Sequence, residues 1–216
     1  MPFRGFRQRF AANALSAFYS AHESQVRKWK DDGLQEDYFC YKPSFRLPGN
    51  VVKSHMHLRL AHGEYFELEE RQDSKSGITS DAGERSDGFV ISKSERLWMV
   101  LREEIKQQPR LFCFYRAEPA KTEKIVRLYG FLIESDKKFT GNVYRFKVAL
   151  VSVETEREMW IREHPRETFD LEEQIDNIPF TEAAKERNPS IHRVLLDPQA
   201  IAYIKPDVVR YENDTL

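Results

Sequence analysis

The pattern of apolar and polar residues changes once along this chain, close to residue 34. Upstream of that point, apolar side chains recur at the spacing of one helix face, at Phe6, Phe10, Ala14, Ala17 and Ala21. Asp32 and Gly33 then supply a stop signal for a helix. The segment predicts one amphipathic helix, or two with a break, over residues 3–31.

From residue 36 the spacing of apolar residues changes to the alternation that is typical of β-strands. Alternating runs bounded by turn residues predict eight strands, near residues 36–42, 50–61, 65–71, 87–93, 96–103, 110–116, 124–134 and 142–153. The connections are too short for crossover helices, so neighbouring strands must be antiparallel. We predict a mainly β (α+β) fold: an eight-stranded antiparallel meander, barrel-like or a sandwich, with an N-terminal amphipathic helix and a short helical C-terminal tail.

The hairpin of the second and third strands can be predicted to its register. A loop of odd length centred on Gly63 pairs Leu58 with Leu68 on the apolar face and Arg59 with Glu67 on the polar face. A loop of even length would turn the apolar residues of the third strand toward the charged face. We therefore predict a three-residue loop with Gly63 at positive φ.

These patterns divide the chain into an N-terminal helical segment (1–33), an antiparallel β core (34–153) and an irregular, helical and acidic tail (154–216). The polar, Gly- and Ser-rich residues 72–86 predict a long loop. In the tail, Asp170 and Glu173 form a capping box for a short helix. Three strands, near 96–103, 110–116 and 124–134, are apolar on both faces. One face can fill the interior, and we expect the N-terminal helix to cover the other, outer face.

The composition is that of a folded protein, since 40% of the 216 residues are hydrophobic and 32% are charged. The longest apolar stretch, near residues 97–101, is too short to span a bilayer. Cys40 and Cys113 stand inside aromatic runs, which predicts buried thiols and no disulfide framework. The Arg-rich start lacks the apolar stretch of a secretory signal. We expect a cytoplasmic protein without membrane contact, with an organelle presequence left open.

Charge is distributed unevenly, although the net charge is −1. Residues 1–32 carry six Arg and Lys against three Asp and Glu, whereas residues 155–216 carry eight against 14. The basic front is either a continuous helix with a solvated basic side or the core of a helix-turn-helix. The second interpretation predicts DNA binding by Arg27, Lys28 and Lys30.

His55 and His57 stand at alternate positions of a predicted strand and therefore share one face. Neutral imidazoles placed in this way can bind one metal ion. Gly49, five residues and then His-X-His resembles the first half of the cupin metal motif, which implies a metal-dependent enzyme. Cupins place a Glu four or five positions after the second His, whereas Glu64 lies seven positions on. A solvated basic face with Lys53, and an anion-binding face for phosphate or nucleic acid, are the other interpretations.

No catalytic motif is recognisable in the chain. It lacks a Gly-rich phosphate loop, a Gly-x-Ser-x-Gly elbow, a Cys-x-x-Cys pair and a His-Glu-x-x-His helix. The adjacent acids Glu69-Glu70 and Glu103-Glu104 fall on strands, where neighbours point to opposite faces. We predict no cofactor and favour a non-enzymatic function, with an enzyme that lacks any such motif left open.

One resemblance covers roughly residues 34–153. It rests on Tyr41-Lys42-Pro43-Ser44-Phe45, Pro48-Gly49-Asn50-Val51-Val52-Lys53-Ser54, Asp87-Gly88-Phe89-Val90-Ile91, Arg96-Leu97-Trp98 and Leu128-Tyr129-Gly130-Phe131-Leu132. These turns and apolar positions resemble the β-rich effector domain that follows a helix-turn-helix in some bacterial transcriptional regulators. The resemblance implies a non-enzymatic sensing module whose ligand is unknown.

The sequence therefore predicts a bacterial sensing or regulatory module that binds a small molecule or a protein partner and is linked to transcription control. Eight-stranded barrels can hold one small ligand inside. The predicted pocket walls are aromatic residues of the strands that are apolar on both faces: Trp98, Phe112, Phe114, Tyr129 and Phe131. The alternative is a cupin-like, metal-dependent enzyme that uses His55 and His57.

Overall fold

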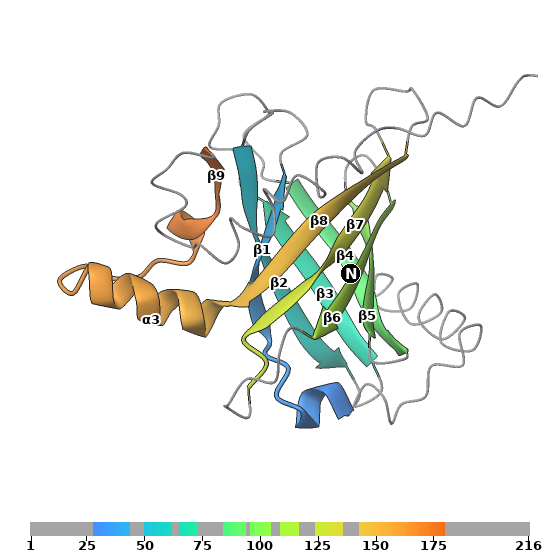
Figure 1. The fold of residues 1–216 in the computed structure, drawn as a ribbon, viewed down its shortest axis with the longest axis horizontal. Helices are drawn as coiled ribbons and strands as arrows, with labels where there is room; N and C mark the ends of the chain where they lie inside the picture. Colours follow the sequence, from blue (N-terminus) through green and yellow to red (C-terminus); the bar gives the residue numbers. More distant parts are fainter. Residues whose placement is uncertain are drawn as a thin grey trace, which may run out of the picture.

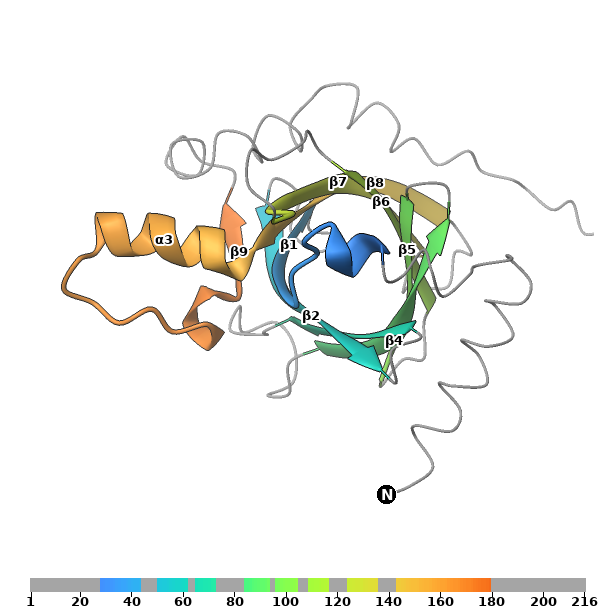
Figure 2. The ribbon, with the colours of Figure 1, turned by 90° about the horizontal axis from the view of Figure 1, so that it is seen from below.

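Eight antiparallel strands form a closed barrel in the computed structural model of this chain (Figure 1). The structure describes residues 28–43, 50–61, 65–72, 84–93, 96–104, 109–116, 124–135 and 143–179. Viewed along the barrel, the strands form a ring (Figure 2). The strands are β1 (Asp37–Pro43), β2 (Asn50–Ala61), β3 (Tyr65–Gln72), β4 (Glu84–Lys93), β5 (Arg96–Glu103), β6 (Pro109–Arg116), β7 (Arg127–Ser135) and β8 (Val143–Ser152).

The ring closes through the first strand. β1 pairs with β2 over its whole length and with β8 over residues 38–41. From β2 to β8, each strand pairs with the strand that follows it in the sequence. The meander prediction is therefore confirmed, and the choice between barrel and sandwich is decided for the barrel, because β1 has hydrogen-bonded partners on both sides.

The strand boundaries differ little from those predicted. The largest differences are at β4, which begins at Glu84, and at β7, which begins at Arg127. Glu84 to Ser86 thus belong to a strand and not to the long polar loop. Most of the predicted N-terminal helix lies outside the described residues. Its last turn, residues 28–31, is helical and ends at Gly33, whose φ of 89° favours glycine.

The hairpin of β2 and β3 has the predicted register. Leu58 pairs with Leu68, and Arg59 with Glu67. Ala61 pairs with Tyr65, which leaves three residues for the loop. Leu58 and Leu68 are buried while Arg59 is exposed, so the apolar face is the inner one. The φ prediction for Gly63 lies outside the described residues.

Two inward-facing glycines bring neighbouring strands close together. A Cβ atom added at Gly88 of β4 would lie 2.0 Å from the carbonyl oxygen of Val100, and one added at Gly130 of β7 would lie 2.0 Å from that of Cys113. No side chain is compatible with such distances. Glycine at these positions allows the close strand approach that a small, strongly coiled barrel requires.

The middle of the barrel is filled with apolar side chains. They alternate with outward-facing residues along each strand and form one continuous core. Phe112 and Phe114 stack inside it with ring centroids 5.8 Å apart. The largest of the fully buried side chains include Tyr38, Met56, Leu58, Phe112, Phe114 and Leu132.

The segment before β1 closes one end of the barrel, seen inside the ring in Figure 2. Trp29 and Leu34 are buried in the core, and Leu34 forms a bridge with Ile125. The hydroxyl of Tyr38 donates a hydrogen bond of 2.8 Å to the Ile125 carbonyl and accepts one of 2.9 Å from the amide of Gln35. We call this end the floor, and the opposite one the loop end.

An arm follows the barrel and lies against the outside of β1, β2 and β8. It consists of helix α3 (Val153–Glu163), a 3-10 turn (Glu172–Gln174) and strand β9 (Asp176–Pro179), which pairs with residues 50–53 of β2. Helix α3 projects away from the barrel in Figure 1. Ser152 accepts a hydrogen bond from the Thr155 amide as its N-cap. The 3-10 turn lies where the capping box of Asp170 and Glu173 predicted a short helix.

The arm creates a second, smaller core on the outside of the barrel. Phe39 and Val151 of the barrel are buried there together with Ile175 of the arm. Lys53 is buried too: its Nζ lies 4.1 Å from the centre of the Phe39 ring and 3.4 Å from Glu156 Oε2. The outer face of β2 at Lys53 is therefore not solvated, contrary to one interpretation of the sequence. Within the described residues, no helix is long and apolar enough to cross a membrane.

Candidate functional site

The alternation that fills the barrel continues to the loop end, where the inward positions become charged. Among the described side chains, polar ones from seven of the eight strands lie at this level. It lies above the apolar core, and all but Glu84 of its members are buried. This charged layer consists of Lys42, Ser54, Glu70, Glu84, Ser86, Glu103, Arg110 and Glu134.

Glu70 on β3 is the best-bonded carboxylate of the charged layer. Its Oε1 accepts hydrogen bonds from Lys42 Nζ at 2.5 Å and from Ser54 Oγ at 2.7 Å. Its Oε2 accepts one from Arg110 Nη1 at 3.0 Å. Burial raises the pKa of Glu70, but the charges of Lys42 and Arg110 outweigh it and lower the pKa from 4.5 to about 2.

Arg110 on β6 is the centre of the layer. Its Nε donates to Glu134 at 3.0 Å, and its Nη1 also donates to Ser86 at 3.3 Å. Its Nη2 lies 3.3 Å from Glu84 and 3.9 Å from Glu103. Burial lowers the pKa of Arg110, yet the surrounding carboxylates raise it above its ordinary value. The guanidinium therefore stays charged in the barrel interior.

The described part of the layer contains more negative than positive groups. Lys42 and Arg110 face four carboxylates, of Glu70, Glu84, Glu103 and Glu134, which gives a formal charge of −2. Charges taken out of water are costly unless they are paired. The chemistry that suits such a layer is the binding of a cationic group.

Reasoning from the sequence missed this layer. Its signal was present, because the inward positions that hold Met56 and Leu68 continue to Ser54 and Glu70 at the loop end of the same strands. The expectation that Glu69 and Glu70 point to opposite faces is confirmed: Glu70 is buried inside, whereas Glu69 pairs outside with Arg85. What could not be foreseen is that seven strands meet at one level.

The five aromatic residues predicted as pocket walls do not lie on one face. Phe112 and Phe114 point into the barrel and are fully buried. Trp98 and Phe131 point outward, where their rings meet edge to face with centroids 6.4 Å apart. Tyr129 also points outward and packs against the second core. A single cavity lined by all five is therefore not formed, because the strand alternation separates them.

The structure brings His55 and His57 together with a third residue, Asp37 of β1. One oxygen, Asp37 Oδ1, lies 2.8 Å from His55 Nε2 and 2.9 Å from His57 Nδ1. The hydrogen bond with His55 is the main cause that lowers the pKa of Asp37. His55 is buried beside Phe39, whereas His57 is half-exposed.

The imidazoles thus have a hydrogen-bond partner in the fold itself. Among the residues that the structure describes, no group of three His, Cys, Asp or Glu side chains is arranged to hold a metal ion. Metal binding by His55 and His57 stays a prediction. An open groove of about 440 Å³ lies beside His57 on the outer face of β2, β3 and β4, and its lining includes Arg59, Glu67, Glu69 and Arg85.

The basic residues predicted to bind DNA lie partly in the described chain. Lys28 and Lys30 are exposed on the helical turn at the floor, with Trp29 between them buried in the core. Arg27 lies outside the described residues. The exposed positions of Lys28 and Lys30 leave both side chains accessible, and the DNA contact stays a prediction.

Comparisons with known proteins give no relative from which a function could be transferred. No family model matches the chain, and searches of curated proteins and of solved structures found no significant match. The functional argument therefore rests on the geometry of this fold.

Proposed function

We propose that this chain is a non-enzymatic sensing module that binds a small, positively charged ligand at the loop end of its barrel. The observation that carries the proposal is the excess of carboxylates around Arg110 in a buried layer. Buried polar layers of this kind cost stability unless every group is satisfied. A bound cation would offset the remaining negative charge and gain affinity from the low dielectric of the interior.

The position of the layer supports ligand access from the loop end. The floor is closed by Trp29 and Leu34, and the middle of the barrel is filled by apolar side chains. Glu84, the most exposed carboxylate of the layer, lies at the start of β4, where the chain enters the barrel wall. Ligands of barrels commonly enter at one mouth.

The proposal is tested by thermal unfolding and calorimetry with matched small molecules. Putrescine, agmatine and choline serve as cations, and succinate and acetate as anions. A ligand that binds only the folded state raises the unfolding temperature with concentration. We expect stabilisation by at least one cation and none by the anions, and the ligand should be recovered chemically unchanged.

Two variants connect binding to the layer. Glu84→Gln and Glu103→Gln each remove one negative charge and should weaken cation binding about 30-fold or more, the range for loss of a buried charged partner. Glu158→Gln, on the exposed side of α3, is the matched control and should bind as the wild type does. Stabilisation by anions alone, or equal affinities in all three variants, would contradict the proposal.

A further inference from the structure

The outward-facing side chains of β5, β6, β7 and β8 form a surface that differs from the rest of the described barrel. The register places them in rows across the sheet. One row runs Trp98, Cys113, Phe131, Lys147, and the next runs Val100, Leu111, Ile133, Arg145. We call this surface the outer wall. It is independent of the charged layer, because the side chains of the two sets point to opposite sides of the barrel.

The outer wall is basic. Arg96, Arg102 and Arg145 are exposed on it, and Lys147 is half-buried. Within the described residues, no Asp or Glu faces outward from these four strands. Carboxylates begin at its border, with Asp87 of β4 opposite Arg102.

Other outer surfaces of the barrel have mixed charge. On β2, β3 and β4, Arg59 pairs with Glu67, and Arg85 pairs with Glu69. The arm, which lies on β1, β2 and β8, carries acidic residues such as Glu154 and Glu156 in its first turn. Among the described outward-facing residues of the barrel, positive charge without interspersed Asp or Glu is thus a property of the outer wall.

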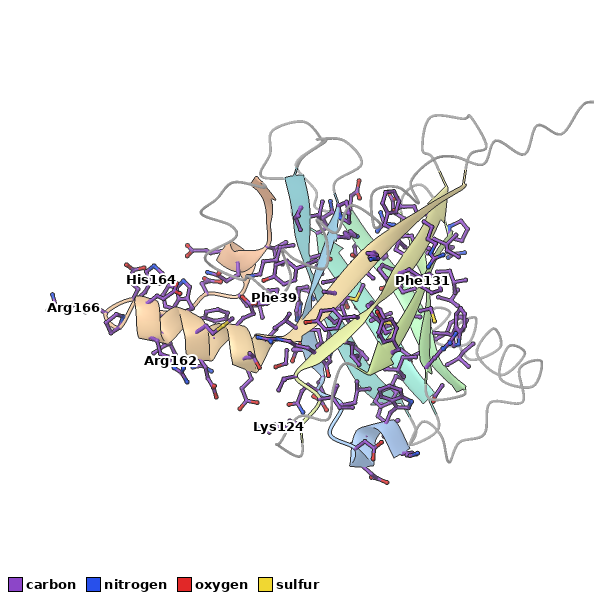
Figure 3. All side chains as sticks on the ribbon, in the orientation of Figure 1. Phe39, Lys124, Phe131, Arg162, His164 and Arg166 are labelled. Atoms are coloured by element: carbon purple, nitrogen blue, oxygen red, sulfur yellow. The ribbon has the colours of Figure 1, made fainter. Side chains whose placement is uncertain are left out.

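The outer wall also presents aromatic rings between its basic groups. Tyr115 is the most exposed, with 52% of its surface accessible, and it lies directly opposite Arg96 in the register. Trp98 and Phe131 meet edge to face, which the small side chain of Cys113 between them allows. The guanidinium of Arg145 lies 4.7 Å from the centre of the Phe131 ring. In Figure 3, Phe131 lies on the side of the barrel away from the arm.

We propose that the outer wall binds single-stranded nucleic acid. Sheets that bind single strands combine aromatic rings, on which bases stack, with basic groups that contact phosphates. Tyr115 and Trp98 are the stacking residues, and Arg96, Arg145 and Lys147 are the phosphate contacts. The rows of side chains on this sheet surface suit an extended single strand, whose unpaired bases can reach the rings.

Binding is measured by fluorescence anisotropy of labelled oligouridine and oligothymidine of about 12 nucleotides, and of a duplex of the same length. We expect both single strands to bind the full chain at about 50 mM salt and to bind more tightly than the duplex. The affinity should fall as salt rises, because phosphate contacts release counterions. Tighter binding of oligouridine would indicate RNA as the natural ligand, and tighter binding of oligothymidine would indicate DNA.

Variants locate the contact. Tyr115→Ala should weaken single-strand binding about fivefold or more, as the loss of one stacked base does. Arg96→Gln with Arg145→Gln should reduce the slope of log affinity against log salt by about 1.4, since each single-strand phosphate contact contributes about 0.7. Arg162→Gln, an exposed basic residue on α3, is the matched control and should change neither quantity.

Tryptophan fluorescence gives an independent readout. A base stacked on Trp98 should quench part of the emission, and Trp98→Phe should remove that quenching. Trp160→Phe should retain it, because Trp160 stacks on His164 in the arm. This comparison separates contact with the outer wall from a general loss of folding.

Three results would contradict single-strand binding by the outer wall. Absence of binding to either single strand at about 50 mM salt overturns the proposal. So does a loss of binding confined to Lys28→Glu with Lys30→Glu, which would place the contact on the N-terminal turn. Tighter binding to polyglutamate or to anionic vesicles than to the oligonucleotides would identify another occupant and would also refute it.

Discussion

Arg110 Nη1 donates a hydrogen bond of 3.0 Å to Glu70 Oε2 across the interior of the barrel. The two residues stand on β6 and β3, which are separated in the sheet by β4 and β5. Closure of the sheet into a barrel brings these strands face to face across the interior. The pair therefore links the closure of the fold to the chemistry of its loop end.

Removing the cation at the centre of the layer should be costly. In Arg110→Met, the buried carboxylate of Glu134 loses the guanidinium that it pairs with, and Glu70 loses one of its two cationic partners. We therefore expect the free energy of unfolding to fall by about 3–5 kcal/mol. Arg59→Met is the control, since Arg59 is exposed and pairs with Glu67 at the surface, and it should cost less than about 1 kcal/mol. Urea unfolding measures the loss of free energy of unfolding in both variants. Similar small losses would show that the layer is solvated.

The low pKa of Glu70, about 2 in the folded chain against 4.5 ordinarily, predicts how acid acts on stability. A carboxyl group with a lowered folded-state pKa contributes stability that is complete above about pH 4.5 and is lost as the pH falls toward 2. Burial opposes this shift, while Lys42 and Arg110 cause it. We expect the free energy of unfolding to decrease over that window, and Glu70→Gln to decrease less steeply. Parallel curves for the two proteins would contradict the assignment.

The hairpin register predicts unequal effects at neighbouring positions. Leu58→Ala truncates a fully buried side chain and should cost about 2–5 kcal/mol. Arg59→Ala, one residue further along β2, should cost less than about 1 kcal/mol because its ion pair is exposed. Chemical unfolding of the two variants measures these two losses in stability. Comparable losses would mean that the two faces of β2 do not differ in burial.

The arm offers a test of buried charge. Lys53 lies over the Phe39 ring and pairs with Glu156. Glu156→Gln leaves the ammonium in place without that carboxylate and should destabilise the chain by about 1–3 kcal/mol. The double variant Lys53→Met, Glu156→Gln removes both charges and approximately keeps the shapes, so it should be closer to the wild type in stability than Glu156→Gln alone. A larger loss in the double variant than in Glu156→Gln, measured by thermal unfolding, would contradict this expectation and would show that the Lys53 ammonium stabilises the arm through its other contacts, such as the Phe39 ring.

His55 and His57 predict a small structural effect and no metal effect. The double variant His55→Ala, His57→Ala loses both hydrogen bonds to Asp37, and each such bond is worth about 1 kcal/mol. We expect a lower unfolding temperature and the same metal content by elemental analysis of purified protein. Stoichiometric zinc, iron or manganese that disappears in the double variant would favour the metal-dependent enzyme instead.

Local patterns in the sequence were sufficient for the strands and for one register. Alternation has a period of two residues, so the face of each side chain follows from its neighbours, and Leu58 with Arg59 already defined both faces of β2. The cross-strand pair of Arg59 and Glu67 then excluded a shift by one residue. Such inferences need only residues close together in the chain, which is why they were correct.

Contacts between distant strands were decided by the tertiary structure alone. Arg110 meets Glu70 from 40 positions away, and Lys53 meets Glu156 from 103 positions away. Alternation tells which face a residue occupies but not which residues share that face across the interior. Closure of β1 onto β8 settled that question, because it fixed the level at which each inward side chain meets the others, and so made the charged layer and the second core.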